Sequence, residues 1–304
     1  MAKIVGAFGV PHNPHFPSWS QEGHPLGEEV DRYYGRVAEQ LRAVEPDAIV
    51  YFTSDHYNLF FESVPIFSIA VAPSASGPSD YPTIARRELP IASELARAVQ
   101  RHVMACNFDV GMLQELEFDH TVIAPLHFLL PDREIPLVPV YISAFLRPIP
   151  SAQRCYALGQ AIREAIEGAD APESPERVAI IASGSFSVEI GGPRLAPDSH
   201  VGVPDPTWTQ RVVELLEAGD FTRLVEEATD EQLGEAGNAA GELLDWIAML
   251  GMIDPAAPAF VETQPQFGHS FASWPIDAVV EGGHAEAGAA EGGPTEASGV
   301  EASR

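Results

Sequence analysis

The chain has 304 residues, of which 45% are hydrophobic, and carries 44 acidic against 17 basic side chains, for a formal net charge of −27. A chain of this length and composition can bury a substantial core. A negative charge of this size repels nucleic-acid phosphates and anionic lipids, so we expect a soluble globular protein that binds neither nucleic acid nor a membrane surface.

The cysteines and the apolar runs indicate a cytoplasmic protein. Cys106 and Cys155 stand far apart, and no Cys-x-x-Cys pair occurs, so the sequence favours neither a disulfide framework nor a thiolate zinc site. The apolar stretch near the N-terminus runs into Pro11 and is too short for a secretion signal. No stretch approaches the roughly 20 apolar residues that span a bilayer.

Taken in chain order, the first two-thirds of the sequence alternates strands and helices. Segments that are apolar on both faces predict buried strands at 3–10, 47–53, 136–143 and 177–184. Apolar residues that recur every three or four positions predict helices at 28–44, 91–104 and 151–166. This alternation predicts an α/β fold with a largely parallel sheet covered by helices.

The last third of the sequence changes character twice. From about 205 to 252 the pattern is wholly helical, with candidate helices at 207–219, 221–228 and 239–252. Residues 281–304 are mostly Gly, Ala and Glu, with almost nothing to bury, and predict a disordered acidic tail. We therefore expect one domain over residues 1–280, with a helical excursion near its end, followed by the tail.

Two histidines follow predicted strands at matching places. His12 comes directly after the strand at 3–10, and His56 comes soon after the strand at 47–53. Ligands bind at the carboxyl ends of the strands in open α/β sheets, so these imidazoles could meet there. Two imidazoles and one carboxylate form the facial triad of non-haem iron(II) oxygenases. The residues alone leave open whether each histidine is a metal ligand or an ordinary polar residue.

Five motifs together resemble those of the class III extradiol ring-cleavage dioxygenases, the superfamily of the catalytic subunit of protocatechuate 4,5-dioxygenase. They occur in the family's order and cover most of residues 3–275. The motifs are "PHNP" from Pro11, "SDHYNLFF" from Ser54, "FDHTVIAPL" from Phe118, "SGSFS" from Ser183 and "AGELLDWIAMLG" from Ala240.

The resemblance implies an iron(II) site whose ligands are His12, His56 and Glu242. His15 is the rival of His12, or a residue that lines the substrate pocket, and Asp245 is the alternative to Glu242. Zinc or manganese are the alternative metals.

The resemblance further implies that His120 is an active-site histidine near the substrate. The competing interpretation is that His120 is a hydrogen-bonded polar residue at the start of a buried helix. His127, one heptad later, is expected to be structural.

The chain departs from the family pattern at Val188. Ring-cleaving members carry a histidine there that acts as the acid-base catalyst, and valine cannot transfer a proton. Loss of a positioned acid or base typically forfeits about 10² to 10⁴ in rate. The chain's candidate substitutes are His120, Glu189, His200 and His269, of which only His120 belongs to a family motif; we expect His269 to be an ordinary surface histidine. Expected substrate-binding residues are His15, Ser185, Ser187, Val188 and Arg194.

The leading hypothesis is an iron(II)-dependent dioxygenase that opens a catechol-like aromatic ring with O2 through an altered proton relay. A divalent-metal hydrolase or carbon-carbon lyase with the same ligands is the first alternative, and a non-catalytic partner subunit is the second. The resemblance also implies a homo-oligomer and allows for a small helical partner subunit.

Overall fold

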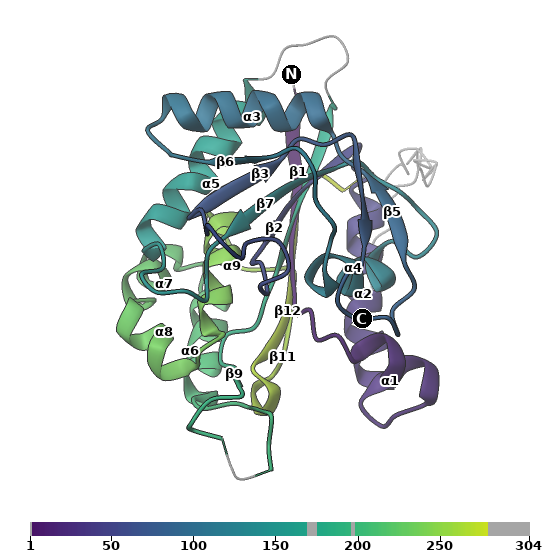
Figure 1. The fold of residues 1–304 in the computed structure, drawn as a ribbon, viewed down its shortest axis with the longest axis vertical. Helices are drawn as coiled ribbons and strands as arrows, with labels where there is room; N and C mark the ends of the chain where they lie inside the picture. The colour runs from purple at the N-terminus through teal and green to yellow at the C-terminus, as the bar shows by residue number, and fades with distance from the viewer. Residues whose placement is uncertain (1, 169–174, 196–197, 279–304) are drawn as a thin grey trace, which may run out of the picture.

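A computed structural model describes residues 2–168, 175–195 and 198–278 (Figure 1). The expected acidic tail at 281–304 lies outside the described residues.

A sheet of eight strands runs through the middle of the molecule. Its strands, in spatial order, are β11 (Phe260–Gln264), β12 (His269–Pro275), β1 (Lys3–Val10), β8 (Arg177–Ser183), β2 (Ala48–Thr53), β7 (Leu137–Ile142), β3 (Phe67–Ala70) and β6 (Gly111–Leu113). The four central strands β1, β8, β2 and β7 are parallel, whereas β12 and β3 join this group antiparallel. Every residue of β2 and β7 is buried, as expected for strands covered on both faces.

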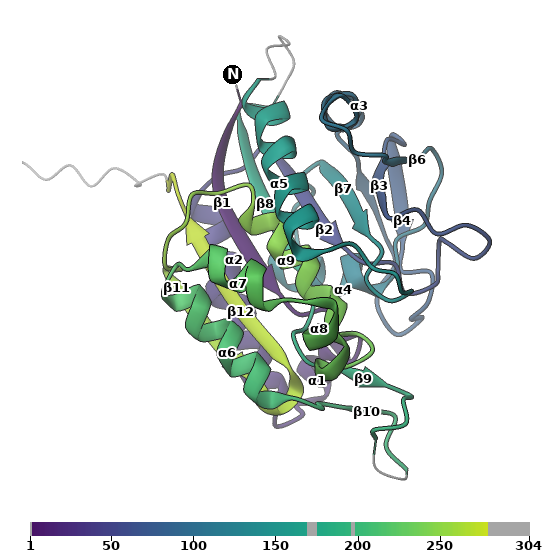
Figure 2. The ribbon, with the colours of Figure 1, turned by 90° about the vertical axis from the view of Figure 1, so that its left-hand side faces the viewer.

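Helices cover both faces of this sheet, so the structure has three layers (Figure 2). One layer contains α1 (Phe16–Glu22), α2 (Gly27–Ala43) and α4 (His120–Leu129). The other contains α3 (Ser93–Ala105), α5 (Ala152–Glu167), α6 (Pro206–Glu217), α7 (Phe221–Glu227) and α9 (Leu243–Leu250). The expected α/β fold with a largely parallel sheet is therefore confirmed.

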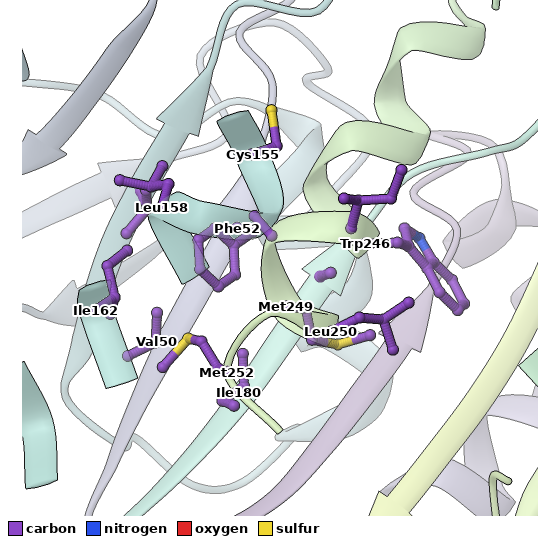
Figure 3. Packing of buried hydrophobic residues seen from close by; sticks show 14 of the residues in the cluster. Val50, Phe52, Cys155, Leu158, Ile162, Ile180, Trp246, Met249, Leu250 and Met252 are labelled. Carbon is purple, nitrogen blue, oxygen red and sulfur yellow. The ribbon is translucent and has the colours of Figure 1, made fainter. Parts of the chain in front are cut away.

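The helices after Asp205 are part of this second layer and do not form a separate subdomain. Trp246 and Met249 of α9 pack beside Phe52 of β2 and Leu158 of α5 in one hydrophobic cluster (Figure 3). The expected helices are present, and the one expected at 239–252 begins with a short 3-10 turn, η1 (Ala240–Glu242), before α9; α1 and α8 (Asp230–Ala236) were not predicted.

Several strands escaped prediction because they lack the long apolar runs of the central strands. The hairpin of β11 and β12 contains polar residues on both strands, and β3 and β6 have only four and three residues. Two small ribbons lie outside the main sheet: β4 (Ser74–Gly77) with β5 (Arg87–Pro90), and β9 (Glu189–Ile190) with β10 (Val201–Gly202). A 3-10 turn, η2 (Pro265–Phe267), joins β11 to β12.

Across the described parts of the chain, no helix has the length and apolar character that crossing a bilayer requires.

Candidate metal centre and active site

Three donor atoms from buried or half-buried side chains converge at the carboxyl edge of the central strands. Nε2 of His12 and Nε2 of His56 each lie 3.2 Å from the same oxygen, Oε1 of Glu242. The two imidazole centroids are 5.0 Å apart, and the side chain of Glu242 is only 3% exposed. The structure thus brings together the three residues that the resemblance pointed to as a ligand set.

The topology explains why residues so distant in sequence meet. Parallel β1 and β2 end at the same edge of the sheet, and His12 and His56 follow those ends. Glu242 is the last residue of η1, directly before α9, and reaches the same edge from the helix layer that contains α5 and α9. Gly184 after β8 permits this approach, because a Cβ at that position would lie 2.7 Å from Cβ of Glu242.

The environment keeps Glu242 ionised. Its second oxygen, Oε2, accepts a hydrogen bond of 2.7 Å from the backbone N–H of Ser185. Burial alone would raise the pKa of Glu242, but the neighbouring His12 and His56 lower it well below its usual range. Ser185, which we expected to bind substrate, therefore contributes through its backbone to holding the carboxylate.

The hydrogen bonds of His12 favour a lone pair on its Nε2, whereas Glu242 favours the protonated form of His56. Nδ1 of His12 lies 3.2 Å from Oγ of Ser183, and that hydroxyl also lies 3.0 Å from the carbonyl oxygen of Thr121. If Ser183 donates to Thr121, it accepts from Nδ1–H of His12, which leaves Nε2 unprotonated. For His56, burial lowers the pKa, but Glu242 outweighs it and the net pKa is raised.

The donor set fits a divalent cation. Two imidazole nitrogens and one carboxylate oxygen face one point, and without a proton or a cation between them their lone pairs would repel. Such ligands bind zinc at about 2.0–2.2 Å, and donors at that radius and roughly right angles lie about 3 Å apart. Non-haem iron(II) uses the same ligand types and leaves positions open for substrates.

His120 stands beside this centre, at the first position of α4. Its ring centroid lies 4.8 Å from that of His56 and 5.7 Å from that of His12. Asp119 caps the helix by accepting a hydrogen bond from the backbone N–H of Thr121. Burial lowers the pKa of His120, so the neutral imidazole is favoured near the centre.

The alternative carboxylate, Asp245, is occupied elsewhere. Its Oδ2 accepts a hydrogen bond of 2.7 Å from Oγ of Ser54, one turn of α9 beyond Glu242. Complete burial raises the pKa of Asp245 well above its usual range, which favours the neutral acid. Asp245 is therefore hydrogen-bonded to Ser54 and to none of the histidines among the described residues. Glu242 is the carboxylate that faces them.

His15 lies further out than His12. It is exposed and stacks on Trp19, with 6.2 Å between ring centroids. Its other neighbour is Tyr81, whose ring in turn contacts His120 at 4.9 Å. His15 thus belongs to an aromatic rim that leads inward to His120, and its assignment to substrate binding stays a prediction.

Two other expected substrate-binding side chains are engaged in local contacts. Oγ of Ser187 donates to the carbonyl oxygen of Ala236 and accepts from the backbone N–H of Asp205. The guanidinium of Arg194 pairs with Glu189 at 2.6 Å and also donates to a backbone carbonyl. Their role in binding substrate stays a prediction, and this pairing also makes Glu189 a poor proton carrier.

Val188 is buried in a segment that packs against the residues directly before Glu242. Its carbonyl oxygen accepts a hydrogen bond of 3.0 Å from the backbone N–H of Ala239, three residues before Glu242. Its apolar side chain cannot exchange a proton, so any proton carrier at the centre must come from another element.

His269 is buried, and the expectation of a surface position for it was wrong. It begins β12, which pairs antiparallel with β1; the register that joins Gly9 to Ala272 places His269 opposite His12 when extended past the strand end. Only 5% of His269 is exposed, and its ring contacts Phe16 at 5.1 Å. Burial, despite the charge of Glu242, lowers the pKa of His269 to about 3.

The turn with Val188 and the start of β12 lie against each other. Gly268 packs so closely that a Cβ there would lie 2.1 Å from the carbonyl oxygen of Ser187. The other two candidate substitutes are less suited, since His200 is exposed and Glu189 is paired with Arg194. His120 and His269 thus remain as histidines beside the centre.

Sequence reasoning missed two polar residues beside these histidines. Gln264 is paired across the hairpin with His269, and both of its amide atoms are buried without a hydrogen-bond partner among the described residues, as is Nδ1 of His269. Asp80, in the loop between β4 and β5, contacts His120. Neither stands in a motif or beside a predicted strand end, so only the tertiary structure reveals them.

Comparisons with known proteins give a family match over most of the chain. The family model described as the catalytic LigB subunit of aromatic ring-opening dioxygenase matches residues 6–274.

Curated relatives include three proteins named 2,3-dihydroxyphenylpropionate/2,3-dihydroxicinnamic acid 1,2-dioxygenase. The protein from Cupriavidus necator is 26% identical over 268 residues, which cover 76% of this chain and 83% of the relative. That from Klebsiella pneumoniae (strain 342) is 29% identical over 73% of this chain and 81% of the relative. That from Escherichia coli (strain K12 / DH10B) is 29% identical over 75% of this chain and 84% of the relative.

Among solved structures, the crystal structure of the uncharacterized protein JW3007 from Escherichia coli K12 aligns with a TM-score of 0.49. It is 16% identical in sequence, and the alignment covers 88% of this chain and 98% of that one.

Proposed function

Because this chain belongs to the family of catalytic LigB subunits of aromatic ring-opening dioxygenases, we propose that it is an iron(II)-dependent extradiol dioxygenase with an altered proton relay. The observation that carries this proposal is the convergence of Nε2 of His12 and Nε2 of His56 on one oxygen of Glu242. The family match identifies the enzyme as a ring-cleavage dioxygenase. Our proposal adds the identity of the metal, its three ligands and the proton relay.

The three ligands would hold iron(II) with a residual positive charge, since two neutral imidazoles and one carboxylate supply a single negative charge. When bound, the iron supplies open coordination positions for a catechol-type substrate and O2 and the redox chemistry between them. Both atoms of O2 enter the ring-opened product, so no separate reductant is consumed.

The remaining side chains prepare the substrate. Phe145 contacts the ring of His56 at 4.7 Å and Tyr81 contacts that of His120 at 4.9 Å, so aromatic side chains lie beside two of the histidines at the centre. Aromatic side chains are suitable neighbours for a planar aromatic substrate. The neutral His120 can accept the proton that a catechol hydroxyl loses on binding, and His269 is the second histidine within electrostatic reach of the centre.

The names of the curated relatives support a proposal for the class of substrate. They are named for 2,3-dihydroxyphenylpropionate and 2,3-dihydroxicinnamic acid, catechols with an acidic side chain. We propose a substituted catechol as the substrate of this enzyme.

The first test is oxygen uptake by protein purified without air and reconstituted with iron(II), over a panel of catechols and hydroxybenzoates. We expect uptake together with a yellow ring-opened product for at least one catechol. The His12→Ala variant should lose both, because one of two imidazole ligands is gone.

His127→Ala is the matched control, since His127 is a half-buried histidine of α4 whose ring packs on Phe128. It should retain uptake. Iron-loaded wild-type protein that consumes no O2 with any catechol would contradict the proposal and favour non-oxidative chemistry at the same centre.

A further inference from the structure

The carboxylate of Asp80 contacts His120 at two points, its backbone N–H and its ring nitrogen Nδ1. Asp80 lies in the loop between β4 and β5, and its Oδ1 accepts a hydrogen bond of 2.9 Å from the backbone N–H of His120. Its Oδ2 lies 2.5 Å from Nδ1 of the same residue. The loop itself is anchored, because the backbone N–H of Ser79 donates to the carbonyl oxygen of Phe118.

This contact fixes which ring nitrogen of His120 carries a proton. Partial burial would raise the pKa of Asp80, but the hydrogen bonds and charge of His120 lower it overall, so the carboxylate is ionised. An ionised carboxylate can only accept hydrogen bonds. Nδ1 of His120 must therefore be the donor, and in the neutral ring Nε2 is left with a free lone pair.

The other neighbours of Asp80 support the same arrangement. The side-chain amide of Asn58 donates to Oδ2 of Asp80 at 3.3 Å and to Oδ2 of Asp119 at 3.1 Å. The ring of Tyr81 contacts the ring of His120 edge-on. The imidazole is thus held in position by a hydrogen bond on one side and by packing on another.

The centre lies within reach of this imidazole. One ring nitrogen from each of His12, His56 and His120 lies within 4.8 Å of the others. Because Asp80 engages Nδ1, Nε2 is the ring nitrogen of His120 that is left for a substrate at the centre, and the opposite tautomer would present an N–H instead.

We propose that Asp80 is the positioning residue of His120, which it holds as the Nδ1–H tautomer so that Nε2 accepts a proton from the substrate. The proposal rests on the proposed function. In this step the substrate O–H bond breaks and an N–H bond forms at Nε2, while the carboxylate of Asp80 stabilises the resulting imidazolium. The proton returns to an oxygen of the ring-opened product, so the step is neutral in protons and involves no electron transfer.

A competing use of these side chains is a second metal site, because Asp80, Asp119 and His120 each offer a donor atom within 4.8 Å of the others. The oxygens of Asp119 are already used: Oδ1 accepts from Thr121, and Oδ2 accepts from Asn58 and from the backbone of His56. Hydrogen bonding of Asp80 to His120 is the arrangement that this network favours.

The deciding measurement is the tautomer of His120, read from its two ring-nitrogen chemical shifts in histidine-labelled full-length protein. Zinc replaces iron because it is diamagnetic, and the signal is assigned by its loss in His120→Gln. We expect Nδ1–H in the wild type. An Nε2–H signal in the wild type would overturn the proposal without recourse to any variant.

Variants add a functional readout. Asp80→Asn should switch His120 to Nε2–H, because the amide now donates to Nδ1, and kcat should fall about 10²-fold or more. KM and bound iron should change little. Asp80→Glu keeps the carboxylate and should retain the wild-type tautomer, and Asp230→Asn, at an exposed aspartate of α8, is the matched control.

The outcomes separate the two proposals. An Asp80→Asn protein with an unchanged tautomer and kcat within threefold of wild type would overturn the role of Asp80. Loss of one of two bound metal ions in Asp80→Asn would overturn it in favour of the second metal site. Absence of O2 uptake by the wild type would contradict the proposed function, while the tautomer still tests the contact itself.

Discussion

At the residue scale, the centre is built from charges and lone pairs that balance only together. Glu242 is almost fully buried, which is costly for a carboxylate unless opposite charge or hydrogen bonds compensate. Ser185 donates to one oxygen, and His12 and His56 face the other. Glu242 is thus stabilised in its ionised form by the same residues with which it would share a cation.

His269 represents the opposite case, a buried histidine that remains uncharged. Its pKa is lowered to about 3 by burial, against an ordinary value of 6.5. Above pH 6.5 the ring is neutral in both the folded and the unfolded chain. Between pH 6.5 and 3 the unfolded chain takes up a proton that the folded chain does not, so the free energy of unfolding decreases as pH falls.

We therefore expect His269→Gln to weaken the acid dependence of stability. One pKa unit corresponds to about 1.4 kcal/mol, so the wild type should lose up to several kcal/mol more than the variant as pH approaches 3. Urea unfolding of metal-free protein at a series of pH values measures this. His200→Gln, at an exposed histidine, is the control, and identical slopes for wild type and His269→Gln would contradict a buried neutral imidazole.

At the element scale, α9 presents Glu242 at its start, so the packing of α9 on α5 also positions this proposed ligand. The two helices contact closely at Gly159 of α5, where a Cβ would lie 2.0 Å from the carbonyl oxygen of Ala248. At Gly251, just beyond α9, a Cβ would lie 2.2 Å from the carbonyl oxygen of Tyr156. Glycine at both places permits backbone contact between the helices.

Gly159→Ala should therefore destabilise the protein, because the methyl group meets backbone that cannot rotate away. Overpacking of this kind costs about 1–3 kcal/mol. Gly35→Ala is the matched control: a Cβ at this exposed position of α2 meets nothing within 4 Å, and replacing a helical glycine gains up to about 1 kcal/mol. Denaturant unfolding of both variants gives the comparison, and equal stability of Gly159→Ala and wild type would refute the close crossing.

At the scale of the whole molecule, a chain of strongly negative net charge carries a site that fits a cation. The formal net charge of −27 creates a field that attracts divalent metal ions and disfavours anionic macromolecules. The proposed ligands come from the ends of β1 and β2 and from the start of α9, so a bound cation would connect both sides of the sheet.

Metal removal should accordingly lower the stability of the whole domain. A ligand that binds only the folded chain stabilises it by about 2.7 kcal/mol at a concentration of 100 times Kd. We expect iron(II) under anaerobic conditions to raise Tm, a chelator to reverse this, and His56→Ala to show neither response. His127→Ala should behave as wild type, and a Tm response preserved in His56→Ala would exclude His56 as a ligand.

The sequence by itself determined the central layer and the ligand candidates. Apolar runs and helical periodicity depend on neighbours along the chain, so β1, β2, β7, β8 and the longer helices could be read directly. The position of His12 and His56 after two of these strands placed them at one edge. Glu242 was identified through the family resemblance, since a lone glutamate at a helix start carries no local signal.

Only the tertiary structure decided which side chains meet across the chain. The hairpin of β11 and β12 has no long apolar run, yet it carries His269 to a position opposite His12 and buries it. The loop before β5 brings Asp80 to His120, and no pattern in either segment indicates the other. Burial and long-range hydrogen bonds depend on residues far apart in sequence, and these are what fix the protonation and orientation of the histidines.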